Sequence, residues 1–167
     1  MPVVERITHT ERRVALDLDA CIECRSCASA CFYGHDEMPV IAFARVGAAM
    51  LPALCRQCED APCVAACPVE AMVRDEDGTI RRLTFRCQGC ESCVGACPFG
   101  ILRCQTFDGA IAKCDLCEDR LHTGAEPRCV VSCPSGALRF CDEREADGLG
   151  LLVLGSRTLG EHPIKRR

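Results

Sequence analysis

One stretch constrains the fold of this chain more than any other: residues 87–98, which read CQGCESCVGACP. The spacing C-x2-C-x2-C-x3-C-P is the bacterial-type arrangement of thiolate ligands for 4Fe–4S clusters. In that arrangement the first three cysteines bind one cluster and the fourth binds a neighbouring cluster. A second motif is therefore needed, and the sequence contains three more.

The four motifs are variations on one pattern. The first motif (residues 21–31) has the same spacing, with Phe32 where the other copies have proline. The second (55–67) has four residues between its second and third cysteines, and the fourth (114–133) has eleven there. The motifs together predict four 4Fe–4S clusters. The predicted iron ligands are Cys21, Cys24, Cys27, Cys31, Cys55, Cys58, Cys63, Cys67, Cys87, Cys90, Cys93, Cys97, Cys114, Cys117, Cys129 and Cys133.

Two other kinds of protein are also rich in cysteine. One is a disulfide scaffold, since 18 of the 167 residues are cysteine. A disulfide framework, however, has no reason to repeat C-x2-C four times with C-x3-C beside each copy. The other is a zinc protein, because C-x2-C pairs also form four-cysteine zinc sites. The closing C-x3-C of every motif favours iron–sulfur clusters over zinc.

Apart from its cysteines, the chain has little material for a core. Aromatic residues make up 4% of it, and tryptophan is absent. We therefore expect the clusters to fill the interior, so that folding and cofactor binding are one event. The predicted fold class is α+β, a duplicated bacterial-type ferredoxin-like fold with short strands and cluster-binding loops. Residues 1–167 are expected to form a single compact unit.

The segments between the motifs predict short strands. Alternating or apolar character favours strands at 14–18 and 40–44. The Asp-Gly step at 77–78 predicts a hairpin whose returning strand is 80–86. The last three motifs each end in Cys-Pro, a turn and an apolar segment, and their spacing of about 30 residues indicates duplication.

The C-terminal third contains three segments outside the motif pattern. The polar insertion 118–128 is predicted to be a surface loop, because it contains glycine and proline. The acidic stretch 142–147 is interpreted as a solvated face. The apolar run 149–154 is interpreted as a strand packed on the chain's own body, with a docking segment for a partner as the alternative. Residues 146–167 form the predicted C-terminal tail.

Charge and hydropathy limit the partners of the chain. The formal net charge is −4, which argues against nucleic acid and favours a basic protein surface. No apolar run approaches the roughly 20 residues of a transmembrane helix, so we expect no direct membrane insertion. The Arg12-Arg13 pair is followed by acidic residues rather than by the apolar region of an export signal. The predicted location is the cytoplasm, where thiols stay reduced.

Four cations lie within one or two residues of predicted ligands: Arg25, Arg56, Arg86 and Lys113. A cation in such a place would favour the reduced form of a cluster. An ordinary side chain facing solvent is the alternative for each of them.

The other reactive side chains show no catalytic arrangement. Cys104 and Cys141 lie outside the sixteen ligands and are interpreted as strand thiols that act as small apolar side chains. The histidines are scattered in polar segments, at positions 9, 35, 122 and 162. Dinucleotide-binding, P-loop and nucleophile motifs are missing from the sequence. We therefore expect no catalytic site in this chain.

Three segments of the sequence carry a family resemblance: CRQCEDAPCV at 55–64, CDLCEDR at 114–120 and RCVVSCP at 128–134. They resemble the four-cluster ferredoxin-like electron-transfer subunits found beside molybdenum- or tungsten-pterin oxidoreductases. Similar subunits serve some hydrogenases and carbon monoxide dehydrogenases. The resemblance covers residues 14–141, and here every ligand position is cysteine.

The resemblance implies which motifs share clusters. The first motif would pair with the fourth, and the second with the third. One half would then be built from about 14–49 and 104–145, with the other half inserted at about 50–103. The implied ligand sets are Cys21, Cys24, Cys27 with Cys133; Cys114, Cys117, Cys129 with Cys31; Cys55, Cys58, Cys63 with Cys97; and Cys87, Cys90, Cys93 with Cys67.

The resemblance also implies a role. The chain would carry single electrons between a catalytic subunit, such as an aldehyde or formate oxidoreductase, and a flavin subunit, a quinone-reducing subunit or a soluble acceptor. The alternatives are a subunit of a hydrogenase or carbon monoxide dehydrogenase complex, and a regulatory or structural iron–sulfur protein. Copies of the chain stacked end to end into a longer wire are a further expectation about partners.

Overall fold

The computed structural model describes residues 12–35, 38, 40–104 and 109–153. The elements in these ranges are short, with helices of four to nine residues and strands of two to five. The helices are α1 (Ser26–Gly34), α2 (Pro62–Ala65), α3 (Ser92–Ala96), α4 (Glu118–Leu121), α5 (Arg128–Val131) and α6 (Glu143–Leu149). The strands are β1 (Arg12–Leu16), β2 (Ala42–Val46), β3 (Ala49–Ala53), β4 (Met72–Arg74), β5 (Ile80–Arg82), β6 (Arg103–Cys104), β7 (Ile111–Ala112), β8 (Leu138–Asp142) and β9 (Leu152–Val153).

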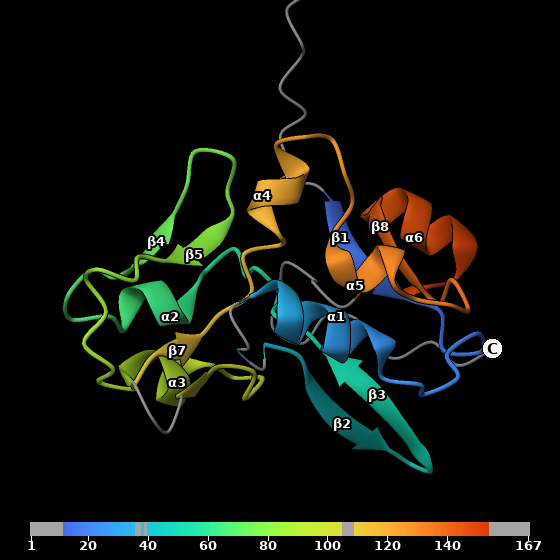
Figure 1. Cartoon of the computed structure of the whole chain (residues 1–167), viewed down its shortest axis with the longest axis horizontal. Helices are drawn as coiled ribbons and strands as arrows, with labels where there is room; N and C mark the ends of the chain where they lie inside the picture. Colours follow the sequence, from blue (N-terminus) through green and yellow to red (C-terminus); the bar gives the residue numbers. More distant parts are fainter. Residues whose placement is uncertain (1–11, 36–37, 39, 105–108, 154–167) are drawn as a thin grey trace, which may run out of the picture.

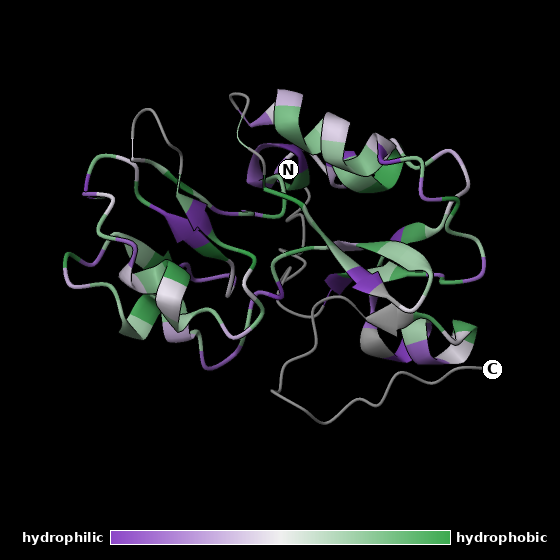
Figure 2. Cartoon of the chain, turned by 90° about the horizontal axis from the view of Figure 1, so that it is seen from below, coloured by the Kyte–Doolittle hydropathy of each residue, from purple (hydrophilic) through white to green (hydrophobic). Residues whose placement is uncertain are grey.

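The elements form two lobes joined in the middle of the molecule (Figure 1). The β1 lobe holds the three-stranded antiparallel sheet β8-β1-β9, the hairpin β2-β3, and helices α1, α5 and α6. The β4 lobe holds the hairpin β4-β5, the pair β6-β7, and helices α2 and α3. The view from below in Figure 2 shows the same separation.

Strands β1 and β8 form the centre of the β1 lobe. Val14 pairs with Phe140 and Leu16 with Leu138, and all four side chains are buried. Their apolar faces pack against α1 and α5, the helices that carry cysteines of the first and fourth motifs. Since the sheet holds both helices, two motifs far apart in the sequence lie side by side.

The β4 lobe has a smaller apolar core. Its fully buried members are Met72, Leu102 and Ile111 with Cys93, and more cysteines pack around them. Strand β7 lies at the junction of the lobes, because Ile111 belongs to this core and the next residue, Ala112, belongs to the core of the β1 lobe. The scarcity of apolar side chains agrees with the composition.

Several predicted strands exist with shifted ends. The strand expected at 14–18 is β1, which ends at Leu16 because Asp17 begins a turn by accepting hydrogen bonds from the Asp19 and Ala20 amides. The strand expected at 40–44 is β2, two residues later, and its hairpin partner β3 was not predicted. The Asp-Gly hairpin is confirmed, with residues 75–79 joining β4 to β5.

The returning strand 80–86 was predicted too long. Strand β5 ends at Arg82, and the amides of Arg86 and Cys87 donate hydrogen bonds to the Leu83 carbonyl in a turn. This turn, rather than a strand, leads into the third motif.

The C-terminal segments agree with expectation in part. The predicted loop 118–128 begins with helix α4, whose Leu121 is buried. The acidic side chains Asp142, Glu145 and Asp147 are exposed, as expected of a solvated face. The stretch also forms helix α6, which Asp142 caps and whose Ala146 is buried against β1 and β8. Of the apolar run 149–154, Leu149 ends α6 and is exposed, Leu152–Val153 form β9 beside β1, and residue 154 lies outside the described residues.

In the described part of the chain, no helix combines the length and the apolar character that crossing a membrane requires.

Candidate metal centres

The four motifs share a backbone conformation at one position. The residue before the second cysteine has a left-handed conformation in every motif: φ is 56° at Glu23, 49° at Gln57, 68° at Gly89 and 60° at Leu116. For a residue with a side chain this conformation costs about 1–2 kcal/mol, so the surroundings must impose it. Its repetition means that each C-x2-C loop bends in the same way around a common centre.

The third cysteine has the same placement in each motif. The third cysteine lies in the first turn of a short helix, namely Cys27 in α1, Cys63 in α2, Cys93 in α3 and Cys129 in α5.

After Cys67, Cys97 and Cys133, proline is followed by a turn with a left-handed third residue, Glu70, Gly100 and Gly136 respectively. In each turn, that third residue donates its amide to the carbonyl of the cysteine. In the first motif Phe32 replaces the proline, and α1 continues to Gly34. The predicted unit of cysteine, proline and turn is confirmed in the three copies that contain proline.

The predicted ligands gather in two groups. Six cysteines of the first and fourth motifs pack in the core of the β1 lobe: Cys21, Cys27, Cys31, Cys114, Cys129 and Cys133. Five cysteines of the second and third motifs pack in the core of the β4 lobe: Cys63, Cys67, Cys87, Cys93 and Cys97. None of the eighteen cysteines, all of which lie in the described ranges, forms a disulfide.

The pKa values of the third cysteines in the first and second motifs depend on neighbouring thiols, including thiols of other motifs. The pKa of Cys27 is raised to about 11, mainly by burial and also by the negative charge of Cys133 and Cys24. Burial likewise raises the pKa of Cys63 to about 11. The thiols that act on Cys63 are Cys55, Cys58 and Cys97, while Lys113 lowers its pKa.

The same relation holds for the third and fourth motifs. Burial raises the pKa of Cys93, and the thiols that raise it further are Cys67, Cys87 and Cys90. Burial is also the largest cause of the raised pKa of Cys129, and the charges of Cys117, Cys31 and Cys27 raise this pKa as well. The third cysteine of every motif therefore has the fourth cysteine of another motif among its neighbours.

The donor set fits an iron–sulfur cluster. Buried thiols with raised pKa values stay protonated by themselves, and a cationic metal core is what would deprotonate them. Backbone amides also point at sulfur atoms: Ala71 donates to Cys67 at 3.2 Å, and Arg128 to Cys117 at 3.4 Å. Such N–H groups stabilise cluster thiolates and tune their potential. Clusters of sulfur donors with amide hydrogen bonds are typical of iron–sulfur sites rather than of reactive thiols.

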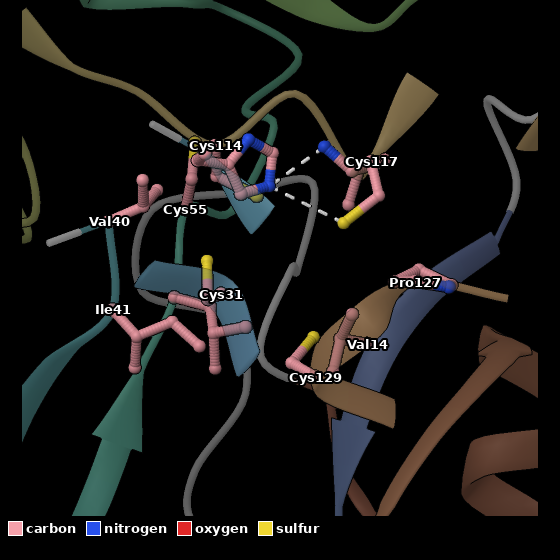
Figure 3. Close-up of a pocket in the computed structure, with 12 residues that line it drawn as sticks. Val14, Cys31, Val40, Ile41, Cys55, Cys114, Cys117, Pro127 and Cys129 are labelled. Atoms are coloured by element: carbon pink, nitrogen blue, oxygen red, sulfur yellow. Dashed lines mark hydrogen bonds between the residues drawn. The ribbon is translucent and has the colours of Figure 1, made fainter. Parts of the chain in front are cut away.

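Two cavities lie next to these sulfur atoms. The first is lined by Cys31, Cys114, Cys117 and Cys129 together with apolar side chains, and Figure 3 shows the sulfurs of Cys31, Cys117 and Cys129 facing the same space. The second cavity is lined by Cys55, Cys58, Cys63 and Cys97. Cys55 also lines the first cavity, so the two spaces meet at this residue.

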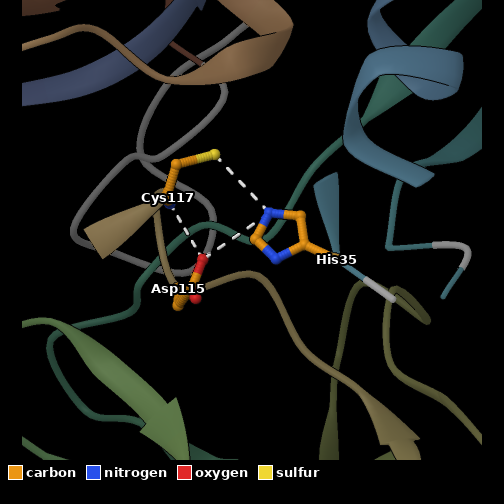
Figure 4. A group of neighbouring side chains, drawn as sticks. All are labelled: His35, Asp115 and Cys117. Atoms are coloured by element: carbon orange, nitrogen blue, oxygen red, sulfur yellow. Dashed lines mark hydrogen bonds and ion pairs between the residues drawn. The ribbon is translucent and has the colours of Figure 1, made fainter. Parts of the chain in front are cut away.

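His35 is a site residue that the sequence reasoning missed. Its Nε2 lies 3.5 Å from the Cys117 sulfur and 3.8 Å from an Asp115 oxygen (Figure 4). Hydrogen bonds with Cys117 and then Cys31 raise the pKa of His35 to about 10, so its ring carries a proton to donate. The three side chains are close enough to hold a metal ion. Because Cys117 also shares the first cavity with Cys31 and Cys129, His35 lies where it can donate a hydrogen bond to a predicted iron ligand. The one available signal was the position of His35, about one helical turn beyond Cys31.

The four cations near ligands have different surroundings. The Arg25 and Arg56 guanidiniums lie over aromatic rings, Arg56 only 3.9 Å from the centre of Phe99. Arg86 is exposed, in agreement with the solvent-facing alternative. Lys113 is buried: burial alone would lower its pKa, but the charges of Cys55 and Cys114 raise it.

The two cysteines outside the ligand set lie on strands, as predicted. Cys141 is buried in β8 beside Ala15 and Ala146. Cys104 is half-buried in β6 and packs against the core of the β4 lobe.

Comparisons with known proteins identify the chain. Residues 46–143 match the family described as 4Fe-4S dicluster domain, and residues 18–34 match the 4Fe-4S binding domain. An iron–sulfur protein of Rhodospirillum rubrum is 39% identical over 150 residues, covering 74% of this chain and 78% of the relative.

Two further relatives belong to oxidoreductase systems. The thiosulfate reductase electron transfer subunit of Salmonella typhi is 36% identical over 153 residues, covering 82% of this chain and 76% of the relative. The iron–sulfur subunit of nitrate-inducible formate dehydrogenase from Escherichia coli strain K12 is 40% identical over 92 residues, covering 54% of this chain and 31% of the relative. With a family match across 46–143 and two relatives matched over three quarters of their length, the chain belongs to the 4Fe–4S dicluster family of electron-transfer iron–sulfur proteins.

Proposed function

We propose that the chain relays single electrons through four 4Fe–4S clusters, each completed by a cysteine from another motif. The supporting observation is the neighbourhood of each third cysteine, which includes a fourth cysteine from a different motif. The proposed ligand sets are Cys21, Cys24, Cys27 with Cys133 (set 1); Cys114, Cys117, Cys129 with Cys31 (set 2); Cys55, Cys58, Cys63 with Cys97 (set 3); and Cys87, Cys90, Cys93 with Cys67 (set 4).

A duplicated fold is part of this proposal. Sets 1 and 2 would occupy the half built from about 14–49 and 104–145, and sets 3 and 4 the inserted half at about 50–103. The two groups of packed cysteines, one in each lobe, support this division.

The proposed order of the relay is set 1, set 2, set 3, set 4. Each cluster, when bound, accepts and gives up one electron. The meeting of the two cavities at Cys55 supports a crossing between sets 2 and 3. Cys24 of set 1 and Cys90 of set 4 are exposed, which supports placing these sets at the two ends of the line.

The proposed partner is the catalytic subunit of a cytoplasmic molybdenum- or tungsten-pterin oxidoreductase, acting on formate, an aldehyde or a sulfur oxyanion. Relatives that serve a thiosulfate reductase and a formate dehydrogenase support this class of partner. A flavin subunit or soluble acceptor would take or supply electrons at the other end. End-to-end stacking of this chain is the remaining proposal for that end. Residues 118–128 and residues 149–167 are the proposed contact segments.

The pairing is tested by two matched substitutions. Cys97→Ser should damage set 3, whose other ligands belong to the second motif, and Cys67→Ser should damage set 4, whose other ligands belong to the third. The measurements are iron per chain in anaerobically purified protein and the electron paramagnetic resonance (EPR) spectrum of the remaining reduced clusters. Loss of set 4 in Cys97→Ser with set 3 intact would contradict the exchange of ligands between motifs.

A further inference from the structure

Lys113 lies at the junction of the two lobes. It follows strand β7 and precedes Cys114, and it is only 8% exposed. Its side chain lines the cavity formed by Cys55, Cys58 and Cys63, while its own backbone leads into the fourth motif. The Lys113 side chain therefore shares a cavity with cysteines of set 3, and its residue is adjacent in sequence to Cys114 of set 2.

Hydrogen bonds hold the ammonium group in this place. Lys113 Nζ donates to the Ile80 carbonyl at 2.6 Å and to the Cys114 carbonyl. The buried Gln57 side chain reinforces the same two residues: it donates to the Cys114 carbonyl at 2.7 Å and accepts from the Ile80 amide at 2.8 Å. Lys113 and Gln57 thus connect the two lobes through a buried network.

The charge of Lys113 is balanced by sulfur. Burying a cation is unfavourable unless an opposite charge faces it. The sulfurs that act on Lys113 are those of Cys55, Cys114 and Cys63, which would be negatively charged as thiolates bound to a cluster. Two neutral carbonyls fix the position of the ammonium, so its net charge remains available to these sulfurs.

We propose that Lys113 sets the reduction potentials of the two central clusters, those of sets 2 and 3. The inference rests on the proposed function. Reduction adds one electron from the partner subunit to a cluster, and no bond forms or breaks. The added negative charge is stabilised by a fixed cation in the buried interior, where charges interact more strongly than at the surface. Lys113 therefore raises the potentials of both central clusters.

Arg86 provides a matched control. It precedes Cys87 as Lys113 precedes Cys114, so the two cations have the same position relative to their motifs. The Arg86 side chain, however, is 49% exposed and lies 3.9 Å from Glu70. Water, salt and this carboxylate screen its charge.

The test uses the full chain purified anaerobically with its clusters. Lys113→Met and Lys113→Gln remove the charge, Lys113→Arg keeps it, and Arg86→Gln removes the exposed cation. Redox titration followed by EPR gives the four midpoint potentials, and iron per chain is measured for each variant.

We expect Lys113→Met and Lys113→Gln to retain their iron and to lower two of the four potentials. The expected shift is at least a tenfold change in the one-electron reduction equilibrium, about 59 mV. The potentials of Lys113→Arg should stay near the wild-type values. Arg86→Gln should change no reduction equilibrium by as much as tenfold.

Unchanged potentials in Lys113→Met and Lys113→Gln, or equal shifts of all four, would overturn the inference. Loss of iron from these two variants would also overturn it, because Lys113 would then serve assembly. The inference would also be overturned if the midpoint potentials of Lys113→Arg fell as far as those of Lys113→Met. A wild-type chain with fewer than four clusters would instead contradict the proposed function, whatever the variants show.

Discussion

The shape of the cluster-binding loops requires a strained backbone conformation at single residues. Glu23, Gln57 and Leu116 adopt left-handed conformations although they carry side chains. At the equivalent place in the third motif stands Gly89, which has a second reason to be small. A Cβ added there would lie 2.5 Å from the Gly109 carbonyl oxygen. Since that oxygen belongs to the backbone, it cannot move away as a flexible side chain could.

Gly89→Ala is therefore expected to remove the cluster of set 4. The substitution combines left-handed strain of about 1–2 kcal/mol with displacement of the segment at Gly109. Gly100→Ala is the control, because it has a similar φ of 60° but meets nothing within 4 Å. Iron per chain should fall in Gly89→Ala only. Equal iron loss in both variants would show that the conformation, and not the close approach, requires glycine.

At the scale of elements, α6 and β9 complete the sheet of the β1 lobe. The Asp142 side chain accepts a hydrogen bond from the Glu145 amide at 2.8 Å and so caps the start of α6. Gly150 ends the helix in a left-handed conformation. Strand β9 then pairs with β1 on the side opposite β8. The segment that begins the predicted tail is thus part of the fold.

Asp142→Ala should destabilise the chain by about 1 kcal/mol through loss of the helix cap, without loss of iron. Asp147→Ala is the matched control at the other end of α6. It removes a negative charge where the helix dipole is unfavourable to one, so it should leave stability unchanged or raise it by a few tenths of a kcal/mol. Urea unfolding followed by circular dichroism measures both. Equal destabilisation by both variants would contradict a capping role for Asp142.

Across the whole molecule, some predicted iron ligands lie at the surface and others are buried. Cys24 and Cys90 are exposed, whereas Cys31, Cys117 and Cys129 are buried. Exposed apolar side chains lie near the exposed thiols in sequence, Ile22 within the first motif and Phe85 before the third. The exposed thiols of Cys24 and Cys90 are therefore more accessible to partners and to oxidants than the buried thiols.

Limited oxidation in the presence of an iron chelator should release sets 1 and 4 before set 2. Thiols freed by cluster loss can be alkylated and located by mass spectrometry. Cys24 and Cys90 should be labelled first and Cys117 last, because burial protects its cluster from both reagents. Labelling of Cys117 at the same rate as Cys24 would contradict this order. Protein kept reduced and anaerobic, treated with the same alkylating reagent, is the control.

The sequence by itself identified the cofactor class, the family and much of the local structure. The ligand spacing and the Asp-Gly turn involve residues that are close together in the sequence. The clusters and the hairpin that they predict can therefore be inferred without knowing how distant segments pack. The repeated left-handed positions and the Cys-Pro turns are local in the same sense.

Only the tertiary structure decided what surrounds the cysteines. The hydrogen bonds of Lys113 with Ile80, Gln57 with Cys114 and His35 with Cys117 join residues 33, 57 and 82 positions apart. Lys113 and Arg86 stand at the same position before their motifs, yet one is buried and the other exposed. The difference arises because β7 runs through the junction of the two lobes, while the turn before the third motif lies at the surface. Such contacts depend on how distant segments pack, and spacing along the chain carries no record of them.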